Sequence, residues 1–183
     1  MQDITFPIGL GQRYTRRGNP YPTITRAQIE ALVESPHSRE KADALWYIPS
    51  SYSGCWARKH LVQQELGAFW WLTADIDEGS PSMDTVIGSV EAALGDVHMM
   101  VYSSSSATHE NLKWRVLVPL SEPFTPYAWA EVQTAFFGEL EREGLTVDEV
   151  LKRAGQLVYL PNVLPNRSFY KSRKIKGARY ALS

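Results

Sequence analysis

Two aspartates end the most apolar stretch of the sequence. Residues 69–76 read FWWLTADI, and Asp77, Glu78 and Gly79 follow at once. A run of this length that is rich in aromatic residues and stops at a Gly-Ser-Pro turn predicts a buried strand. Side chains alternate along a strand, so we expect Asp75 and Asp77 on one face, roughly 6 to 7 Å apart. Two carboxylates so placed repel each other unless a cation offsets their charge, and Mg²⁺ is held in this way.

The same pair also has a purely structural interpretation. Asp77 could cap the turn over residues 78–81, because aspartate side chains accept hydrogen bonds from the backbone that follows them. From this stretch alone, metal binding and turn formation both stay open.

A polar loop and a basic strand come further along the chain. Residues 103–111 read SSSSATHEN, and residues 113–120 read KWRVLVPL. Hydroxyl groups and exposed backbone amides can cradle phosphate oxygens, and Arg115, at the start of a core strand, could hold a phosphate with two parallel N–H donors. Alternatively, the loop is an ordinary surface loop, and Arg115 pairs with Glu110 or Asp75 to stabilise the fold.

A third acidic position precedes the last apolar segment. Asp148 lies ahead of residues 155–162, GQLVYLPN, which predict a short strand that a proline ends. Asp148 could equally be the N-cap of a short helix over residues 149–153.

Basic residues gather near both ends of the sequence. Arg16 and Arg17 lie in an arm rich in glycine and proline, and residues 166–180 contain no acid. The basic residues of this second stretch are Arg167, Lys171, Arg173, Lys174, Lys176 and Arg179. Cations bind a phosphate backbone and interleaved aromatic rings stack on bases, so we expect contact with nucleic acid. A solvated basic face is the alternative.

Helical and strand patterns alternate along the chain. A capping box at Thr25 and Gln28 predicts a helix that ends before Pro36. The other predicted elements are helices over residues 81–95 and 126–143 and strands over residues 44–48, 97–102, 113–120 and 155–162. Because strand, helix and strand follow one another within residues 69–102, we expect a pair of neighbouring parallel strands. That pair would bring the serine-rich loop to the same end of the sheet as the carboxylates.

Composition is that of an ordinary globular domain. The chain has 183 residues, a formal net charge of −1 and one cysteine, which excludes an internal disulfide framework. No apolar run reaches the length of a membrane span and no leader pattern opens the sequence, so we expect a cytoplasmic protein without membrane contact. There is no glycine-rich nucleotide loop of the Walker or Rossmann type. His60 is expected at the surface, because no second metal ligand lies at a recognisable spacing.

Taken in order, these motifs resemble the archaeo-eukaryotic primase superfamily, and within it the primase-polymerase domains of phages and plasmids. In that family a paired aspartate ends a strand, as Asp75 and Asp77 do here. A Ser/Thr-rich loop with a histidine then leads into an arginine-containing strand that ends in Pro-Leu-Ser, similar to residues 103–121. A further aspartate precedes Gln-x-x-Tyr-Leu-Pro, which Asp148 and residues 156–161 match.

The resemblance covers about residues 40–165. It implies an α/β fold with an RRM-like palm sheet of the archaeo-eukaryotic primase type and a small N-terminal lobe. Residues 1–183 would form a single catalytic domain, in which residues 166–183 are a basic tail.

The resemblance also implies a function, that of a DNA primase and polymerase in phage or plasmid replication. Such a nucleotidyltransferase joins NTPs or dNTPs on a single-stranded DNA template and works with a helicase or an accessory priming domain. The implied catalytic residues, which would hold two Mg²⁺ or Mn²⁺ ions, are Asp75, Asp77 and Asp148. The implied nucleotide-binding residues are Ser104, Ser106, His109 and Arg115. The implied template-binding residues are Arg16, Arg17, Lys171, Arg173, Lys174 and Lys176.

One position departs from the family pattern. Relatives have the histidine directly after the loop serine, and Ala107 stands at that place here. Either His109 takes the role, or the role is lost and nucleotide binding is weaker.

Other functions stay open on the sequence alone. They are a non-catalytic nucleic-acid-binding domain of a replication initiator, a metal-dependent nuclease, which also uses clustered carboxylates, and an α/β domain whose aspartates only form caps and turns.

Overall fold

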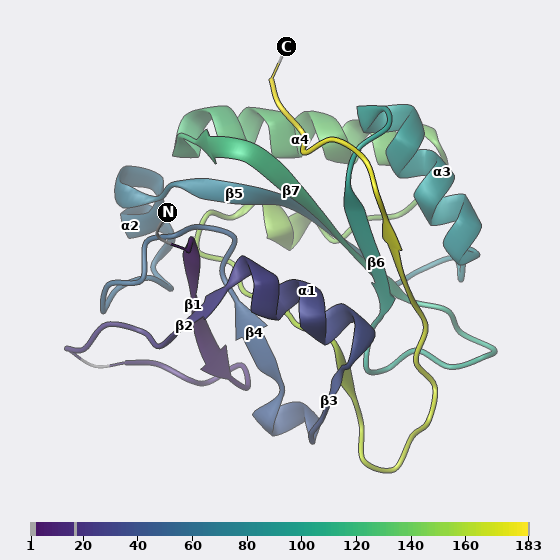
Figure 1. Ribbon diagram of the computed structural model, residues 1–183, viewed down its shortest axis with the longest axis horizontal. Coiled ribbons are helices and arrows are strands. Elements are labelled where there is room, and N and C mark those ends of the chain that lie inside the picture. The colour runs from purple at the N-terminus through teal and green to yellow at the C-terminus, as the bar shows by residue number, and fades with distance from the viewer. Residues whose placement is uncertain (1–2, 17, 183) are drawn as a thin grey trace.

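A four-stranded sheet forms the centre of the molecule (Figure 1). The computed structural model describes residues 3–16 and 18–182. The strands of this sheet lie in the order β10-β6-β7-β5, and each is antiparallel to its neighbours. They are β5 (Phe69–Ile76), β6 (Met99–Ser103), β7 (Trp114–Phe124) and β10 (Ser172–Ile175).

The prediction that the strands of residues 69–102 are parallel neighbours was wrong. β7 lies between β5 and β6 and is antiparallel to both. The 11-residue strand β7 returns directly from β6 as a hairpin, and its other side then pairs with β5. β5 and β6 therefore run parallel without being neighbours. Their C-terminal residues lie at the same end of the sheet, where β7 begins.

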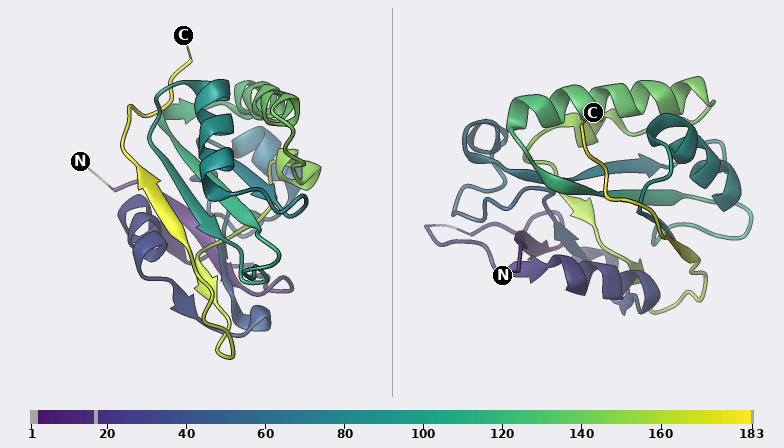
Figure 2. Two further views of the ribbon diagram at one scale, coloured as in Figure 1. Left: turned by 90° about the vertical axis from the view of Figure 1, so that its right-hand side faces the viewer. Right: turned by 45° about the horizontal axis from the view of Figure 1, so that its top comes forward.

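Two helices, α3 (Met83–Leu94) and α4 (Pro126–Arg142), cover one face of this sheet (Figure 2). α3 begins after Ser82, whose side chain accepts a hydrogen bond from the Thr85 amide, so the helix starts two residues later than Pro81 suggested. Gly95, with φ of 80°, ends it. In the described part of the chain, no helix is both long and apolar enough to span a membrane.

A smaller lobe covers the other face. Its elements are β1 (Thr5–Leu10), β2 (Thr23–Thr25), α1 (Arg26–Glu34), β4 (Leu45–Tyr47) and β8 (Val158–Tyr159), and its sheet has the order β2-β1-β4-β8. The short helix α2 (His60–Leu66) contacts α4. The capping box that starts α1 is present as predicted, because Thr25 and Gln28 exchange hydrogen bonds of 3.1 and 2.9 Å. Two short strands, β3 (His37–Ser38) and β9 (Asn162–Val163), pair in parallel, and the short 3₁₀ helices are η1 (Lys41–Asp43) and η2 (Glu149–Lys152). The expected mixed α/β fold is confirmed.

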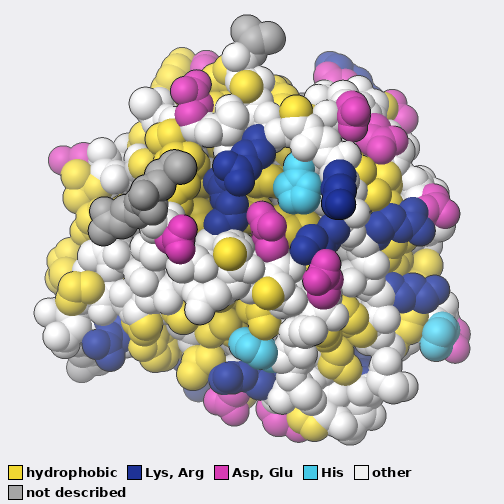
Figure 3. Space-filling view, viewed as in Figure 1, with side chains coloured by type: hydrophobic (Ala, Val, Ile, Leu, Met, Phe, Trp, Pro, Cys, Tyr) yellow, Lys and Arg dark blue, Asp and Glu magenta, His cyan; other side chains and the backbone are white. Residues whose placement is uncertain are grey.

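The basic C-terminal stretch is built into the main sheet. β10 pairs with β6 along four residues. Arg173 forms an ion pair with Asp84 at 2.6 Å, and Lys174 forms one with Glu34 at 2.9 Å. On the face shown in Figure 3, basic and acidic side chains lie next to one another over the middle of the molecule. Part of the positive charge predicted for nucleic acid is thus balanced within the fold.

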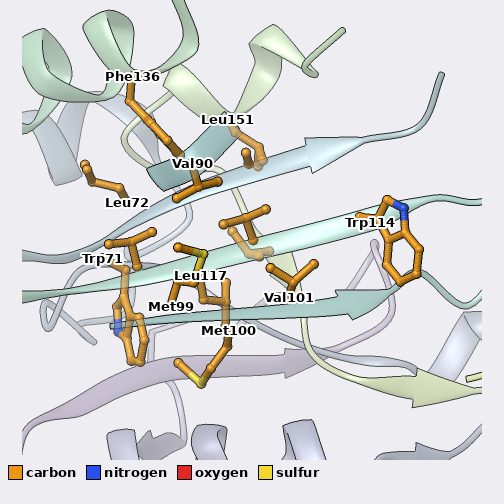
Figure 4. Close-up of a cluster of buried hydrophobic side chains, with 14 of the residues drawn as sticks. Trp71, Leu72, Val90, Met99, Met100, Val101, Trp114, Leu117, Phe136 and Leu151 are labelled. Atoms are coloured by element: carbon orange, nitrogen blue, oxygen red, sulfur yellow. The ribbon is translucent and has the colours of Figure 1, made fainter. Parts of the chain in front are cut away.

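Both faces of the main sheet are buried, which explains why β5 reads as a nearly continuous apolar run. In Figure 4, Leu72 and Phe136 lie on the side of the sheet that carries α4, and Trp71 and Met100 lie on the opposite side. All four are at most 1% exposed. The packing fixes β5 from both sides, so its acidic end has a defined position.

Candidate active site

A cavity of about 180 Å³ lies at the end of the main sheet where the C-terminal residues of β5 and β6 lie. Five residues predicted from the sequence line it, namely Asp75, Asp77, Ser106, Arg115 and Asp148. The predicted catalytic carboxylates and part of the predicted phosphate site therefore come together in one place.

Asp75 and Arg115 form the central ion pair of this cavity. They are register partners on β5 and β7, and Arg115 Nε donates to Asp75 Oδ2 at 3.0 Å. Their side chains are only 16% and 12% exposed. The guanidinium also lies 5.5 Å from the centre of the Tyr159 ring, a cation–π contact. Of the two pairings considered for Arg115, the one with Asp75 is present.

The charge balance around Asp75 is incomplete. Burial raises the pKa of Asp75 above its ordinary value; Arg115 opposes this rise, and Asp77 and Asp148 add to it. Burial lowers the pKa of Arg115, but Asp75, Tyr102 and Asp77 together more than compensate, so the pKa of Arg115 is raised. One arginine therefore does not fully offset the charge of three neighbouring carboxylates.

One oxygen of Asp75 has no partner among the residues that the structure describes. Oδ2 accepts from Arg115, whereas Oδ1 is buried and accepts no hydrogen bond from the described residues. An unpaired buried carboxylate oxygen costs free energy unless a ligand satisfies it. A cation or a hydrogen-bond donor in the cavity would satisfy this atom.

Asp77 lies just beyond β5, on the same side of the strand as Asp75. Lys113 lies opposite it, with Nζ 3.7 Å from Asp77 Oδ1. The Asp77 side chain is 46% exposed, so this pair is loose and screened by solvent. The expected placement of the two carboxylates on one face is thus present, and each has a basic residue across the sheet.

Asp148 reaches the cavity because β5 is an edge strand. The outer carbonyls of an edge strand need partners, and the Asp148 amide donates to the Asp75 carbonyl at 3.0 Å. Asp148 is also the N-cap of η2, since its Oδ1 accepts from the Val150 amide at 3.0 Å. The two interpretations of Asp148 are therefore compatible, because the cap fixes the side chain that lines the cavity.

The three aspartates fit a divalent cation in their chemistry, although they do not form a closed cage. Within residues 3–16 and 18–182, no three His, Cys, Asp or Glu side chains are arranged to hold a metal by themselves. Mg²⁺ keeps several waters and is commonly held by one or two carboxylates together with substrate phosphates. The unpaired Asp75 Oδ1 is the kind of hard oxygen ligand that such a cation takes.

The serine-rich loop divides into an inner and an outer part. Ser104 is buried, and its hydroxyl lies 3.2 Å from that of Ser106, which is exposed at the cavity. Ala107 is 1% exposed. The ring of His109 packs edge-on against Phe169 at 4.8 Å and is not part of the cavity lining. Nucleotide binding by Ser104 and His109 stays a prediction.

The predicted template-binding residues are spread over two surfaces. Arg17 lies outside the described residues, and Arg16 lines a pocket on the N-terminal lobe. Lys171 and Lys176 are exposed on either side of β10. Their contact with nucleic acid stays a prediction.

Five polar residues line the cavity without having been assigned a role from the sequence. They are Lys41, Ser105, Gln156, Tyr159 and Asn162. Gln156 and Tyr159 belong to a motif that the sequence analysis had singled out. Lys41 carries no local signal, because only the packing of the N-terminal lobe brings η1 next to β5.

Comparison with known proteins finds a similar fold among the solved structures. No family model matches the chain, and no curated protein matches it. A solved structure, the AEP domain of the cyanophage S-2L primase-polymerase (PrimPol), is similar over 97% of this chain and 84% of that chain, with a TM-score of 0.56 and 12% sequence identity. This likeness is one of fold.

Proposed function

We propose that the chain is a metal-dependent nucleotidyltransferase of the primase-polymerase type, which adds nucleotides to a strand paired with a single-stranded DNA template. The observation that carries the proposal is the unpaired Asp75 Oδ1 in a cavity shared with Asp77, Asp148 and Arg115. The fold shared with a phage primase-polymerase domain supports it.

The three aspartates would hold Mg²⁺ or Mn²⁺. When bound, the metal would lower the pKa of the attacking 3′-hydroxyl and neutralise charge on the triphosphate. The aspartates themselves need only stay ionised and in place, because phosphoryl transfer depends on positioning and charge neutralisation rather than on a side-chain nucleophile.

Basic and polar groups of the same cavity would bind the triphosphate. Arg115 is held by Asp75 through Nε, and a guanidinium has further N–H donors that can face a phosphate. Lys41 adds a second cation from the N-terminal lobe, and Ser106 adds a hydroxyl. Binding of the nucleotide would thus span the two lobes.

The ion pairs explain how the cavity tolerates its acidic charge. Arg115 and Lys113 each lie beside one aspartate. A divalent cation would therefore bind to carboxylates that are already oriented, which lowers the cost of organising the site.

Primer extension on single-stranded DNA with Mg²⁺ or Mn²⁺ tests the proposal. Wild type should lengthen a labelled primer, and Asp75→Asn or Asp77→Asn should reduce the rate at least about 100-fold, since several kcal/mol of charge stabilisation are lost. Asp96→Asn makes the same change on an exposed residue outside the cavity and should have no effect.

Other outcomes would assign a different function. Shortening of the labelled strand that depends on Asp75 would identify a nuclease. Binding of DNA with neither lengthening nor shortening would favour a non-catalytic initiator domain.

A further inference from the structure

A second pocket, which we call the Trp56 pocket, lies on the N-terminal lobe. Its volume is about 240 Å³, and it is lined by Thr15, Arg16 and Tyr21 from one loop and by Trp56, Arg58 and Lys59 from another. Figure 2 shows the two loops side by side, and the Tyr21 amide donates to the Ser53 carbonyl at 2.8 Å. The lining combines aromatic rings with cations.

Trp56 is exposed without serving the core. It is 49% exposed and belongs to neither of the two hydrophobic clusters of the described residues. Lys59 Nζ lies 4.4 Å from the centre of its ring. An exposed indole beside a cation is the arrangement on which the bases of a single strand stack while their phosphates are neutralised.

The loop that carries Trp56 is firmly anchored. Arg58 Nη1 donates to the carbonyls of Gln12 and Tyr14, at 2.7 and 2.8 Å. Gln63, which is fully buried, donates from Nε2 to the Ala57 carbonyl at 2.9 Å. The pocket is therefore formed before any ligand arrives, and binding does not have to order the loop.

The charge of the pocket favours a polyanion. Neither residues 4–29 nor residues 44–64, which include its whole lining, contain an Asp or a Glu. Arg16, Arg58 and Lys59 thus act without a carboxylate nearby in the sequence. A peptide partner would need many acidic residues to match this surface, whereas a nucleic acid strand offers both phosphates and rings.

A strip of the surface connects this pocket with the active-site cavity. An adjoining cavity of about 430 Å³ is lined by residues that include Arg13, Tyr14, Lys41 and Tyr159. Lys41 and Tyr159 also line the active-site cavity, and the ring of Tyr14 contacts that of Tyr21 at 6.1 Å. The strip therefore runs from the carboxylates to the Trp56 pocket.

We propose that the Trp56 pocket binds a nucleobase of the single-stranded template, stacked on the indole, while Arg16 and Lys59 neutralise the adjoining phosphates. The proposal rests on the proposed function, since the strip then leads the template to the site of nucleotide addition. It assigns template binding to the N-terminal lobe. The two cations of β10, Arg173 and Lys174, already form ion pairs within the fold.

Binding of a fluorescent oligothymidylate, measured by anisotropy without nucleotides, tests the proposal. Trp56→Ala should weaken binding at least about fivefold, the loss expected for one stacked base, whereas Trp56→Phe should keep most of the affinity. Tyr127→Ala removes a ring that is 75% exposed on α4 and should change nothing. Equal affinity of wild type and Trp56→Ala would overturn the proposal.

Cys55 gives a second measurement on the unaltered protein. It is the only cysteine of the sequence and lines the Trp56 pocket. Saturating oligothymidylate should slow its reaction with a maleimide at least about fivefold, as expected for a covered thiol. An unchanged rate under saturating conditions would also overturn the proposal.

Parallel primer extension separates this proposal from the proposed function. If wild type extends primers but binding does not depend on Trp56, the pocket proposal fails and the proposed function stands. If binding depends on Trp56 but no nucleotide is added, the pocket proposal stands as a single-strand site and the proposed function fails.

Discussion

Gln133→Leu tests how the acidic strand β5 is held in position. β5 is an edge strand, and its outer carbonyls at residues 71, 73 and 75 accept from Trp129, Gln133 and Asp148, respectively. The Gln133 amide makes two bonds to the Thr73 backbone, donating to the carbonyl at 2.5 Å and accepting from the amide at 3.2 Å. It thus replaces the neighbouring strand that β5 lacks on this side.

The magnitude follows from the two backbone groups that would lose their partner. Gln133 is fully buried and Thr73 is 1% exposed, so no solvent can replace the lost bonds. Each buried unsatisfied group costs about 1 to 3 kcal/mol, so Gln133→Leu should lower the free energy of unfolding by about 2 to 6 kcal/mol. Leucine fills most of the same volume, so little of this loss comes from a cavity.

Urea denaturation of wild type and variant measures this loss. Gln64→Leu makes the same chemical change at an exposed position of α2 and should stay within about 0.5 kcal/mol of wild type. If Gln133→Leu is as stable as Gln64→Leu, the amide does not protect the edge of β5 and the reasoning is refuted.

Three further changes have defined outcomes. Arg115→Met should destabilise the fold by about 3 to 5 kcal/mol in denaturant titrations, because Asp75 is left buried without its cation, and Asp75→Asn should relieve much of that loss. Burial, together with Arg39, lowers the pKa of His37, so the unfolded chain binds a proton more readily than the folded one. The free energy of unfolding should therefore fall as the pH drops below the ordinary pKa of histidine, and His37→Gln should remove this part of the pH dependence. Tyr170→Phe loses the 2.7 Å hydrogen bond that the Tyr170 hydroxyl donates to the Val33 carbonyl, and it should lower the free energy of unfolding by about 1 kcal/mol. A pH dependence that His37→Gln leaves unchanged would contradict the second prediction, and an unchanged stability of Tyr170→Phe would contradict the third.

Local patterns predicted the elements that carry the site. The capping box of α1 and the glycine that ends α3 were each predicted from a few neighbouring residues, and both are present. Asp75 and Asp77 could be assigned to one face because strand periodicity does not depend on the neighbours. The serine-rich loop was expected at the same edge, and it lies there.

Long-range packing determines the strand order, the ion pairs and the position of Lys41, which local sequence patterns did not predict. Strand order depends on which edge a hairpin joins, so the insertion of β7 between β5 and β6 has no local signature. The ion pairs of β10 have no local signature either, because Asp84 and Glu34 lie 89 and 140 positions away in the sequence from Arg173 and Lys174, with which they pair. Lys41 was missed for the same reason.

Asp148 shows that a capping residue can also line the candidate active site. Its side chain caps η2 and its amide holds the edge of β5. A capping signal in the sequence therefore does not argue against a residue in an active site.

Binding of Mn²⁺, followed by electron paramagnetic resonance in the presence and absence of a nucleoside triphosphate, tests whether the three aspartates form a metal site for nucleotide addition. Wild type should bind Mn²⁺ more tightly with nucleotide, and Asp75→Asn, Asp77→Asn and Asp148→Asn should each weaken binding while Asp96→Asn should not. If wild type binds no Mn²⁺ under either condition, or if none of the three substitutions alters binding, the cavity is not such a metal site.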